Sequence, residues 1–337
     1  MNLLLLVLIV VVLLVIYLFR PIRPLAGPAA KPGPTGKAGA RLPASGYQEA
    51  VLRIEAMRQA EAQETVKDVC QSILLSHGER TRDVLVLLHG FTNCPEQFHE
   101  LGRRLHALGY TVFIPRTPWH GLSDRLTHDI SKLTAEEMVG FANQVVDVAH
   151  GLGERVTVSG ISGGGTIACW VGQNRADVDI AMPIAAMLGV AFVPGSFTQA
   201  FARLFNHLPD FYMWWDPRTK DKNPFSIDYA YPGYSVHSMS EVLRLGVIVR
   251  QQAVTQPPAA KKIVMVLNES EPGVSNPELE KITADWQKNR ANTELSTFRL
   301  PAKLKLPHDI ITPETPGLPV EAVYALLIQC IQSETSV

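Results

Sequence analysis

The 337-residue sequence predicts an α/β fold with a mostly parallel, doubly wound sheet. The main observation is that strand-like apolar runs alternate with amphipathic helical segments from Asp83 onward. A run such as Val84–Gly90 is apolar almost throughout, which is typical of a strand buried on both faces of a parallel sheet. With 46% hydrophobic and 19% charged residues, the chain can bury a sizeable core in one large domain or two small ones.

The N-terminal segment is the most apolar part of the chain. Asn2–Phe19 carries no charged side chain and predicts a transmembrane anchor over residues 1–20. A cleaved signal peptide is the alternative, supported by the small residues of 24–30, but a signal peptide has a basic segment before a shorter apolar run. Here the basic residues follow the run, so the positive-inside rule predicts a single-pass anchor with the remaining chain in the cytoplasm. These residues are Arg20, Arg23, Lys31, Lys37 and Arg41.

The segment that follows is expected to separate the anchor from the folded domain. Residues 21–46 are rich in Pro, Gly and Ala without apolar periodicity, which predicts a flexible linker. Residues 47–70 then place Val51, Ile54 and Met57 at helical spacing, so a short helix opens a domain that covers 47–337.

Within this domain the sequence predicts a series of strands and helices. An amphipathic helix over 96–109 ends at a glycine, and a helix over 134–153 begins with Thr134 and Glu137 in the spacing of a capping box. A further helix starts near Gly164, and the last one covers 318–333. The expected strands are 84–90, 111–116, 155–160, 178–188, 261–268 and 293–301.

One serine lies in a glycine-rich turn between an expected strand and an expected helix. Gly160 and Gly164 stand two positions before and after Ser162, as a tight turn that exposes a nucleophilic hydroxyl requires. The following helix would direct its positive end and the Gly163 amide at the reacting centre. A phosphate-binding glycine loop is the weaker alternative, because neither G-K-[ST] nor G-x-G-x-x-G with an acidic partner is present.

A nucleophilic serine needs a base and an acid, and chain order helps to select them. His308 lies between the last expected strand and the last helix, where its side chain can reach the strand ends. The acid should follow the strand at 261–268, where Glu269 and Glu271 are the candidates. We prefer Glu271, because it lies deeper in the turn, and Asp309 is expected to point elsewhere.

A second oxyanion donor is expected from the loop after the first sheet strand. The loop begins with His89 and Gly90, which we expect to shape it, and the amide of Phe91 is the natural partner of Gly163.

Charge and cysteines exclude several other classes of function. The net charge of −1 gives no basic field for a nucleic acid, and no His/Cys cluster has metal-ligand spacing. The four cysteines are widely spaced, and although two disulfides are possible, we expect all four to be reduced. They are Cys70, Cys94, Cys169 and Cys330.

Taken together, these motifs resemble those of the α/β-hydrolase fold. HGFT (89–92), PRTPWHGLSD (115–124), GISGG (160–164), the acid near Glu271 and the HD pair at 308–309 resemble the serine esterases and monoacylglycerol-lipase-like hydrolases. The resemblance covers about residue 70 to the C-terminus. It implies Ser162 as nucleophile, His308 as base and the Phe91 and Gly163 amides as oxyanion hole. This family more often has Asp where Glu271 stands.

The resemblance also implies an inserted helical cap, or lid, over 189–258. This segment is rich in aromatic residues, among which Trp214 and Trp215 are candidate substrate contacts, with a place in the protein core as the alternative. The sequence therefore predicts a membrane-anchored serine hydrolase of carboxylic, acyl or lipid-derived esters that needs no metal or organic cofactor. An amidase or peptidase with the same triad, and an inactive membrane-tethered binding module, are the alternatives.

Overall fold

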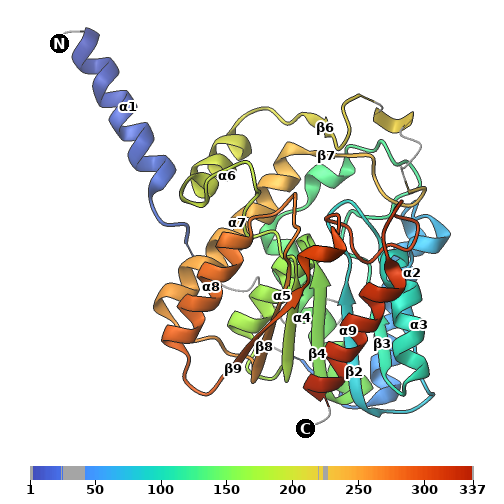
Figure 1. Ribbon diagram of the computed structural model, residues 1–337. Helices are drawn as coiled ribbons and strands as arrows, with labels where there is room; N and C mark the ends of the chain where they lie inside the picture. The colour runs from blue at the N-terminus through green and yellow to red at the C-terminus, as the bar shows by residue number, and fades with distance from the viewer. Residues whose placement is uncertain (1–2, 24, 26–41, 219, 223–226, 336–337) are drawn as a thin grey trace.

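The computed structural model describes residues 3–23, 25, 42–218, 220–222 and 227–335. Most of the linker predicted for residues 21–46 lies outside these ranges. Figure 1 shows a central sheet enclosed by helices, with a single N-terminal helix that projects from the body.

The central sheet has seven strands in the order β1-β3-β2-β4-β5-β8-β9. All neighbouring pairs are parallel except β1 and β3, so the prediction of a mostly parallel sheet is confirmed. Leu88, at the carboxyl end of β2, pairs with Gly160, near the carboxyl end of β4. The two strand ends therefore lie together at one edge of the sheet. The strands are β1 (Ile73–Leu75), β2 (Thr81–Leu88), β3 (Thr111–Ile114), β4 (Gly153–Ile161), β5 (Ile180–Ile184), β8 (Lys262–Asn268) and β9 (Glu294–Leu300).

Helices cover both faces of this sheet (Figure 1). The helices α3 and α9 lie on one face, and α4, α5, α7 and α8 lie on the other. The apolar side chains of both layers and of the strands form one continuous core. The helices are α2 (Tyr47–Gln63), α3 (His99–Ala107), α4 (Ala135–Leu152), α5 (Gly163–Asn174), α7 (Val236–Thr255), α8 (Asn276–Asn289) and α9 (Val320–Thr335).

Most elements with clear sequence signals occur where the sequence predicts them. The helix α4 begins with the expected capping box, in which the Thr134 hydroxyl accepts from the Glu137 amide and the Glu137 carboxylate accepts from the Thr134 amide. The expected strand 178–188 is shorter, because β5 ends at Ile184 and Ala185 has a positive φ of 40°. The edge strand β1, the helix α8 and the elements of the cap are additions to the sequence prediction.

A cap lies between β5 and α7, over the carboxyl ends of the strands (Figure 1). It contains α6 (Thr198–His207) and an antiparallel pair of short strands, β6 (Tyr212–Trp214) and β7 (Gly233–Ser235), which we call the cap hairpin. The expected insertion of 189–258 also includes α7. That helix packs on α5 and α8, and it forms the crossover from β5 to β8 rather than part of the cap.

The N-terminal helix α1 (Leu3–Phe19) covers most of the segment predicted as a transmembrane anchor over 1–20. Among the described residues, no helix is both long enough and apolar enough to cross a membrane. The transmembrane helix is therefore not confirmed.

The cysteines require a correction to the sequence prediction. Cys70 and Cys94 form a disulfide, whereas Cys169 and Cys330 are free and buried. The prediction of four reduced cysteines was wrong for the first pair, because the loop after β2 folds back onto the 3₁₀ turn Asp68–Cys70 and leaves the two Cα atoms 5.2 Å apart. Such proximity across 24 residues depends on tertiary structure and has no local sequence signal.

Candidate active site

The turn between β4 and α5 holds Ser162 in a strained conformation. Its φ of 55° and ψ of −114° lie outside the regions that most residues with side chains adopt. The Ser162 amide donates to Ile184 O at 3.0 Å, and Ser162 O accepts from the Met187 amide at 3.0 Å, so the end of β5 and the segment that follows it hold the backbone.

The flanking glycines allow this turn to form. A Cβ atom at Gly160 would lie 2.5 Å from Gly164 O, and one at Gly164 would lie 2.2 Å from Leu88 O. Both contacts are with backbone atoms, so any side chain at these two positions would force β2, β4 and α5 apart.

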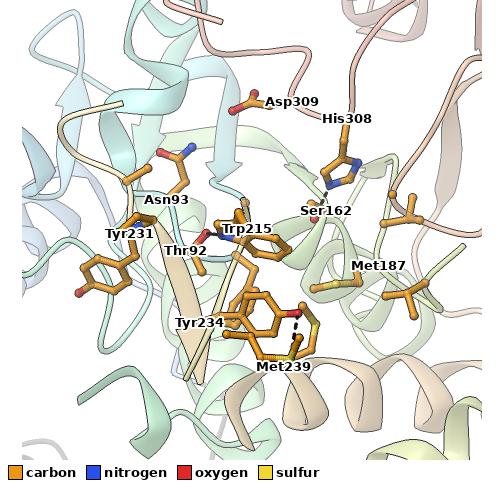
Figure 2. Close-up of a pocket in the computed structure, with 18 of the residues that line it drawn as sticks. Thr92, Asn93, Ser162, Met187, Trp215, Tyr231, Tyr234, Met239, His308 and Asp309 are labelled. Atoms are coloured by element: carbon orange, nitrogen blue, oxygen red, sulfur yellow. Dashed lines mark hydrogen bonds between the residues drawn. The ribbon is translucent and has the colours of Figure 1, made fainter. Parts of the chain in front are cut away.

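Three side chains from distant parts of the chain form a hydrogen-bonded series. The Ser162 Oγ atom lies 2.9 Å from His308 Nε2, and His308 Nδ1 lies 2.8 Å from Glu271 Oε1. Figure 2 shows the first of these contacts at the upper wall of the cavity. Ser162 is 8% exposed and the Glu271 side chain is fully buried, whereas His308 is partly exposed.

The structure separates the two candidate acids. Glu271 Oε1 also accepts hydrogen bonds from the Gly273 and Val274 amides at 2.7 and 3.1 Å, which fix the carboxylate beside the imidazole. Glu269 instead lies at the surface, and its Oε2 accepts from the Ala302 amide at 3.0 Å.

The loop after β2 approaches the start of α5. A Cβ atom added at Gly163 would lie 3.1 Å from the Phe91 nitrogen, so the two backbone segments are in contact beside Ser162. Within the described part of the chain, neither the Phe91 nor the Gly163 amide has a hydrogen-bond acceptor. Two free amides next to a hydroxyl can receive an oxyanion.

A cavity of about 720 Å³ opens beside Ser162 and His308. Its size falls within the range of sites for small organic ligands, and its walls are mainly apolar. The rings of the aromatic residues Phe201 and Phe205 lie 4.3 Å apart, and Phe211 continues this row. Other apolar wall residues are Met187, Val190, Met213, Val236, Met239 and Leu243.

The two candidate tryptophans of the cap have different environments. Trp215 lines the cavity, as Figure 2 shows, whereas Trp214 is not among the lining residues. The alternation of side chains along a strand explains the difference, because Met213 and Trp215 face the cavity while Tyr212 and Trp214 share the opposite face. The Tyr212 and Trp214 rings stand edge to face with centroids 5.3 Å apart.

Two buried histidines support the loop after β2. His89 Nε2 accepts from the Thr117 amide at 3.1 Å, and its Nδ1 lies 3.0 Å from Gly90 O. Burial lowers the pKa of His120 to about 4, and burial beside His120 holds the pKa of His89 well below its ordinary value of 6.5. Both rings are therefore neutral at pH 7, so His89 Nε2 can act as an acceptor.

Sequence reasoning missed the side chains that position these loops. Gln97 accepts from the Gly90 amide at 2.7 Å and donates to Asp309 at 3.1 Å, which links the loop after β2 to the loop of His308. Asn268 donates to Pro307 O at 2.9 Å. Amides in these positions have no local sequence signature. Within the described ranges, no group of three or more His, Cys, Asp or Glu side chains could hold a metal ion.

Several solved structures share this fold. The structure of LipS and LipT, described as metagenome-derived lipolytic enzymes, matches with a TM-score of 0.58 at 18% identity, and the match covers 80% of this chain and 99% of that one. The monoacylglycerol lipase of Paleococcus ferrophilus matches with a TM-score of 0.57 at 15% identity, with coverage of 78% and 98%. These identities are low, so the matches establish similarity of fold.

Sequence comparison adds a relative and a family. A thermostable monoacylglycerol lipase of Bacillus sp. (strain H-257) is 28% identical over 170 residues, which are 48% of this chain. The chain spans 60% of the length of that relative. Residues 85–293, more than half of the chain, match the profile of the alpha/beta hydrolase family. The chain therefore belongs to the alpha/beta hydrolase family.

Proposed function

We propose that this protein is a serine hydrolase that cleaves carboxylic esters, with Ser162 as nucleophile, His308 as general base and Glu271 as acid. The observation that carries the proposal is the hydrogen-bonded series from Ser162 Oγ through His308 to Glu271 Oε1, at 2.9 and 2.8 Å, at the wall of a cavity. The two free amides of Phe91 and Gly163 beside the serine support an oxyanion hole.

In the first half of the reaction, His308 Nε2 takes the proton of Ser162 Oγ as this oxygen attacks the ester carbonyl carbon. The carbonyl electron pair moves onto its oxygen, and the Phe91 and Gly163 amides donate to that oxyanion. When the oxyanion re-forms the carbonyl, the bond to the alcohol oxygen breaks. His308 then gives its proton to the departing alcohol, and the acyl group remains on Ser162.

In the second half, water takes the place of the alcohol. His308 Nε2 accepts a proton from water as the water oxygen attacks the acyl carbon, and collapse of the second oxyanion returns the Ser162 hydroxyl and releases a carboxylic acid. Through both steps the Glu271 carboxylate accepts a hydrogen bond from the His308 Nδ1–H and stabilises the imidazolium. No step requires a metal ion or an organic cofactor.

The substrate that we propose is an ester with an apolar acyl group, such as a lipid-derived ester. The support is the apolar cavity of about 720 Å³, whose aromatic row of Phe201, Phe205 and Phe211 can cover an alkyl chain. The names of the lipolytic relatives agree with this class.

The first experiment is covalent labelling with a fluorophosphonate probe. We expect the wild-type protein to be labelled and Ser162→Ala and His308→Ala to stay unlabelled, with all three folded by circular dichroism. A folded wild-type protein that resists the probe would favour the alternative of an inactive binding module. A panel of p-nitrophenyl esters and matched anilides then separates an esterase from the alternative amidase or peptidase, because the triad is common to both.

We also propose that α1 attaches the protein to a lipid surface. About half of each side chain from Val10 to Ile16 is exposed, around the whole circumference of the helix, which is a large apolar surface without cover. Arg20 and Arg23 follow the helix, where they can meet anionic headgroups.

The cap holds the carboxyl end of α1. Gln199 donates to Leu18 O and Arg20 O at 3.1 and 2.7 Å, and Arg203 donates to Pro21 O at 3.1 Å. A lipid-bound α1 would therefore keep the cap close to the membrane, where lipid-derived esters are found.

Sedimentation with liposomes tests this attachment. We expect the full chain to sediment with vesicles of phosphatidylcholine and phosphatidylglycerol, and the variant Leu13→Glu/Ile16→Glu to remain in the supernatant. Leu52→Glu is the matched control, because Leu52 is an exposed apolar residue on α2, away from α1. Equal sedimentation of all three proteins would contradict the proposal.

For the side of the membrane we propose the cytoplasmic leaflet, whose anionic lipids attract basic residues. The Cys70–Cys94 disulfide is an opposing observation, because such bonds persist mainly in oxidising compartments. Protease added to intact cells distinguishes a catalytic domain in the cytoplasm from one on the opposite, oxidising side of the membrane. Digestion of the catalytic domain from outside would place it on the oxidising side.

A further inference from the structure

Thr92, in the loop that carries the Phe91 amide, has an unfavourable backbone conformation. Its φ of 68° is unusual for a β-branched residue, and it is 5% exposed. A conformation of this kind is unfavourable and persists only where surrounding groups hold it. The question is which groups hold Thr92.

Thr92 accepts hydrogen bonds from residues that adjoin each of the two strands of the cap hairpin. The Trp215 indole N–H donates to Thr92 Oγ1 at 3.0 Å, and the Tyr231 amide donates to Thr92 O at 2.8 Å. Trp215 directly follows β6 and Tyr231 precedes β7, and the Trp215 amide donates to Pro232 O at 3.0 Å. Figure 2 shows the indole lying beside Thr92 under Ser162.

The same hairpin packs against the neighbouring Phe91. The Phe91 ring meets the Trp215 ring edge to face with centroids 6.4 Å apart, and it lies 6.1 Å from the Tyr234 ring. Trp215 and Tyr234 also contact each other at 4.4 Å. The cap hairpin thus fixes the main chain of Thr92 and the side chain of Phe91, and the Phe91 amide nitrogen is bonded directly to the Cα atom that carries this side chain.

We propose that Trp215 is a positioning residue that holds the Phe91 amide in the oxyanion hole through Thr92. This inference rests on the proposed function, in which the Phe91 amide stabilises the oxyanion. Its consequence is that the oxyanion hole depends on the seated cap: when the cap hairpin moves away, Thr92 loses two hydrogen bonds and can relax to a negative φ. The rotation would turn the Phe91–Thr92 peptide and, through Phe91 itself, carry the Phe91 amide away from Ser162.

The kinetic test uses substitutions that remove single hydrogen-bonding atoms. Trp215→Phe keeps an aromatic ring but removes the indole donor, and Thr92→Val keeps the side-chain shape but removes the acceptor. Complete loss of an oxyanion donor costs about 10²–10³ in rate, so we expect partial displacement to lower kcat by about 10-fold with KM changed by less than about 2-fold.

A double-mutant cycle separates this role from simple packing. The two substitutions break the same hydrogen bond, from the Trp215 indole to Thr92 Oγ1. The variant Trp215→Phe/Thr92→Val should therefore be slower than either single variant by no more than about 2-fold. Trp214→Phe is the matched control, since that indole belongs to the same hairpin but faces away from the cavity, and we expect its kcat to equal that of wild type. The proposal would be overturned if the loss of kcat in the double variant equalled the product of the two single-variant losses. It would also be overturned if Trp215→Phe raised KM without lowering kcat.

Hydrogen exchange provides a readout that does not depend on activity. In the proposed arrangement, amides of the peptide spanning 90–94 exchange faster in Trp215→Phe than in wild type or Trp214→Phe. If the wild-type protein hydrolyses no ester, the proposed function fails, yet faster exchange would still support the link from Trp215 to the loop. Unchanged exchange in Trp215→Phe would overturn that link whether or not the protein is active.

Discussion

Glu271 and His308 meet through a single carboxylate oxygen, Glu271 Oε1, which lies 2.8 Å from His308 Nδ1. The same oxygen accepts two backbone amides, while the buried Oε2 has no hydrogen-bond partner among the described residues. A carboxylate in this position accepts a hydrogen bond from a protonated Nδ1. The other ring nitrogen, His308 Nε2, then carries no proton and faces the Ser162 hydroxyl as an acceptor. The acid therefore selects the tautomer in which the imidazole can act as a base.

Glu271→Gln should abolish most of the activity while the fold remains. The amide has nearly the same shape but no charge to stabilise the imidazolium, and it can favour the wrong tautomer. We expect kcat to fall by about 10³–10⁴-fold. Glu269→Gln is the matched control, with kcat expected within about 2-fold of wild type, because the Glu269 carboxylate accepts from the Ala302 amide at the surface, away from His308. A large loss of kcat in Glu269→Gln with little change in Glu271→Gln would instead assign the role of the acid to Glu269.

Met239→Trp should shorten the acyl chains that the protein accepts. Met239 is 7% exposed and lies on the cavity wall, so a larger ring there removes space for an alkyl chain. We expect kcat/KM for a decanoyl ester to fall by about 10-fold or more relative to an acetyl ester, since one methylene in an apolar site is worth about 1–3 kcal/mol. An equal loss for both esters would mean that the variant had disturbed the triad instead.

The buried histidines predict that stability decreases in mild acid. The pKa of His120 is about 4 in the folded protein and about 6.5 in the unfolded chain, so the unfolded state binds more protons between these values. The free energy of unfolding should therefore decrease as the pH falls from about 6.5 to 4, by up to about 1.4 kcal/mol per pH unit for this residue. Urea titrations at pH 7 and pH 5 measure the slope. His120→Gln should reduce it, and an unaltered slope would remove His120 as a cause.

Breaking the disulfide should destabilise the protein measurably. The bond between Cys70 and Cys94 closes a loop with a sequence separation of 24, for which the chain-entropy relation gives about 3 kcal/mol. Cys70→Ala/Cys94→Ala should lower the free energy of unfolding by that order, and a reducing agent should shift wild type to the same value. The reducing agent should have no effect on the double variant. A wild-type protein that does not respond to reduction would indicate that these thiols are free in solution.

The sequence was sufficient to find the elements with local signals. Ser162 lies in a glycine pattern that favours a strand-to-helix turn, and His308 follows from chain order, whereas the acid was narrowed to two glutamates and selected between them by position in the turn. The cap hairpin could not be found, because its strands have three residues each and no periodicity. The positive φ of Thr92 and the bonds of Gln97 depend on contacts between distant segments, which one sequence does not encode locally.

The close approach at Gly164 also limits how this protein can be altered by selection. The atom that a Cβ would meet at 2.2 Å is the backbone oxygen of Leu88, at the buried carboxyl end of β2, so no rotation of a side chain can make space. In a library with all twenty amino acids at position 164, we expect active clones to carry glycine alone. Laboratory evolution of new specificities would then proceed through the cap and the cavity wall, where side chains rather than strands form the boundary.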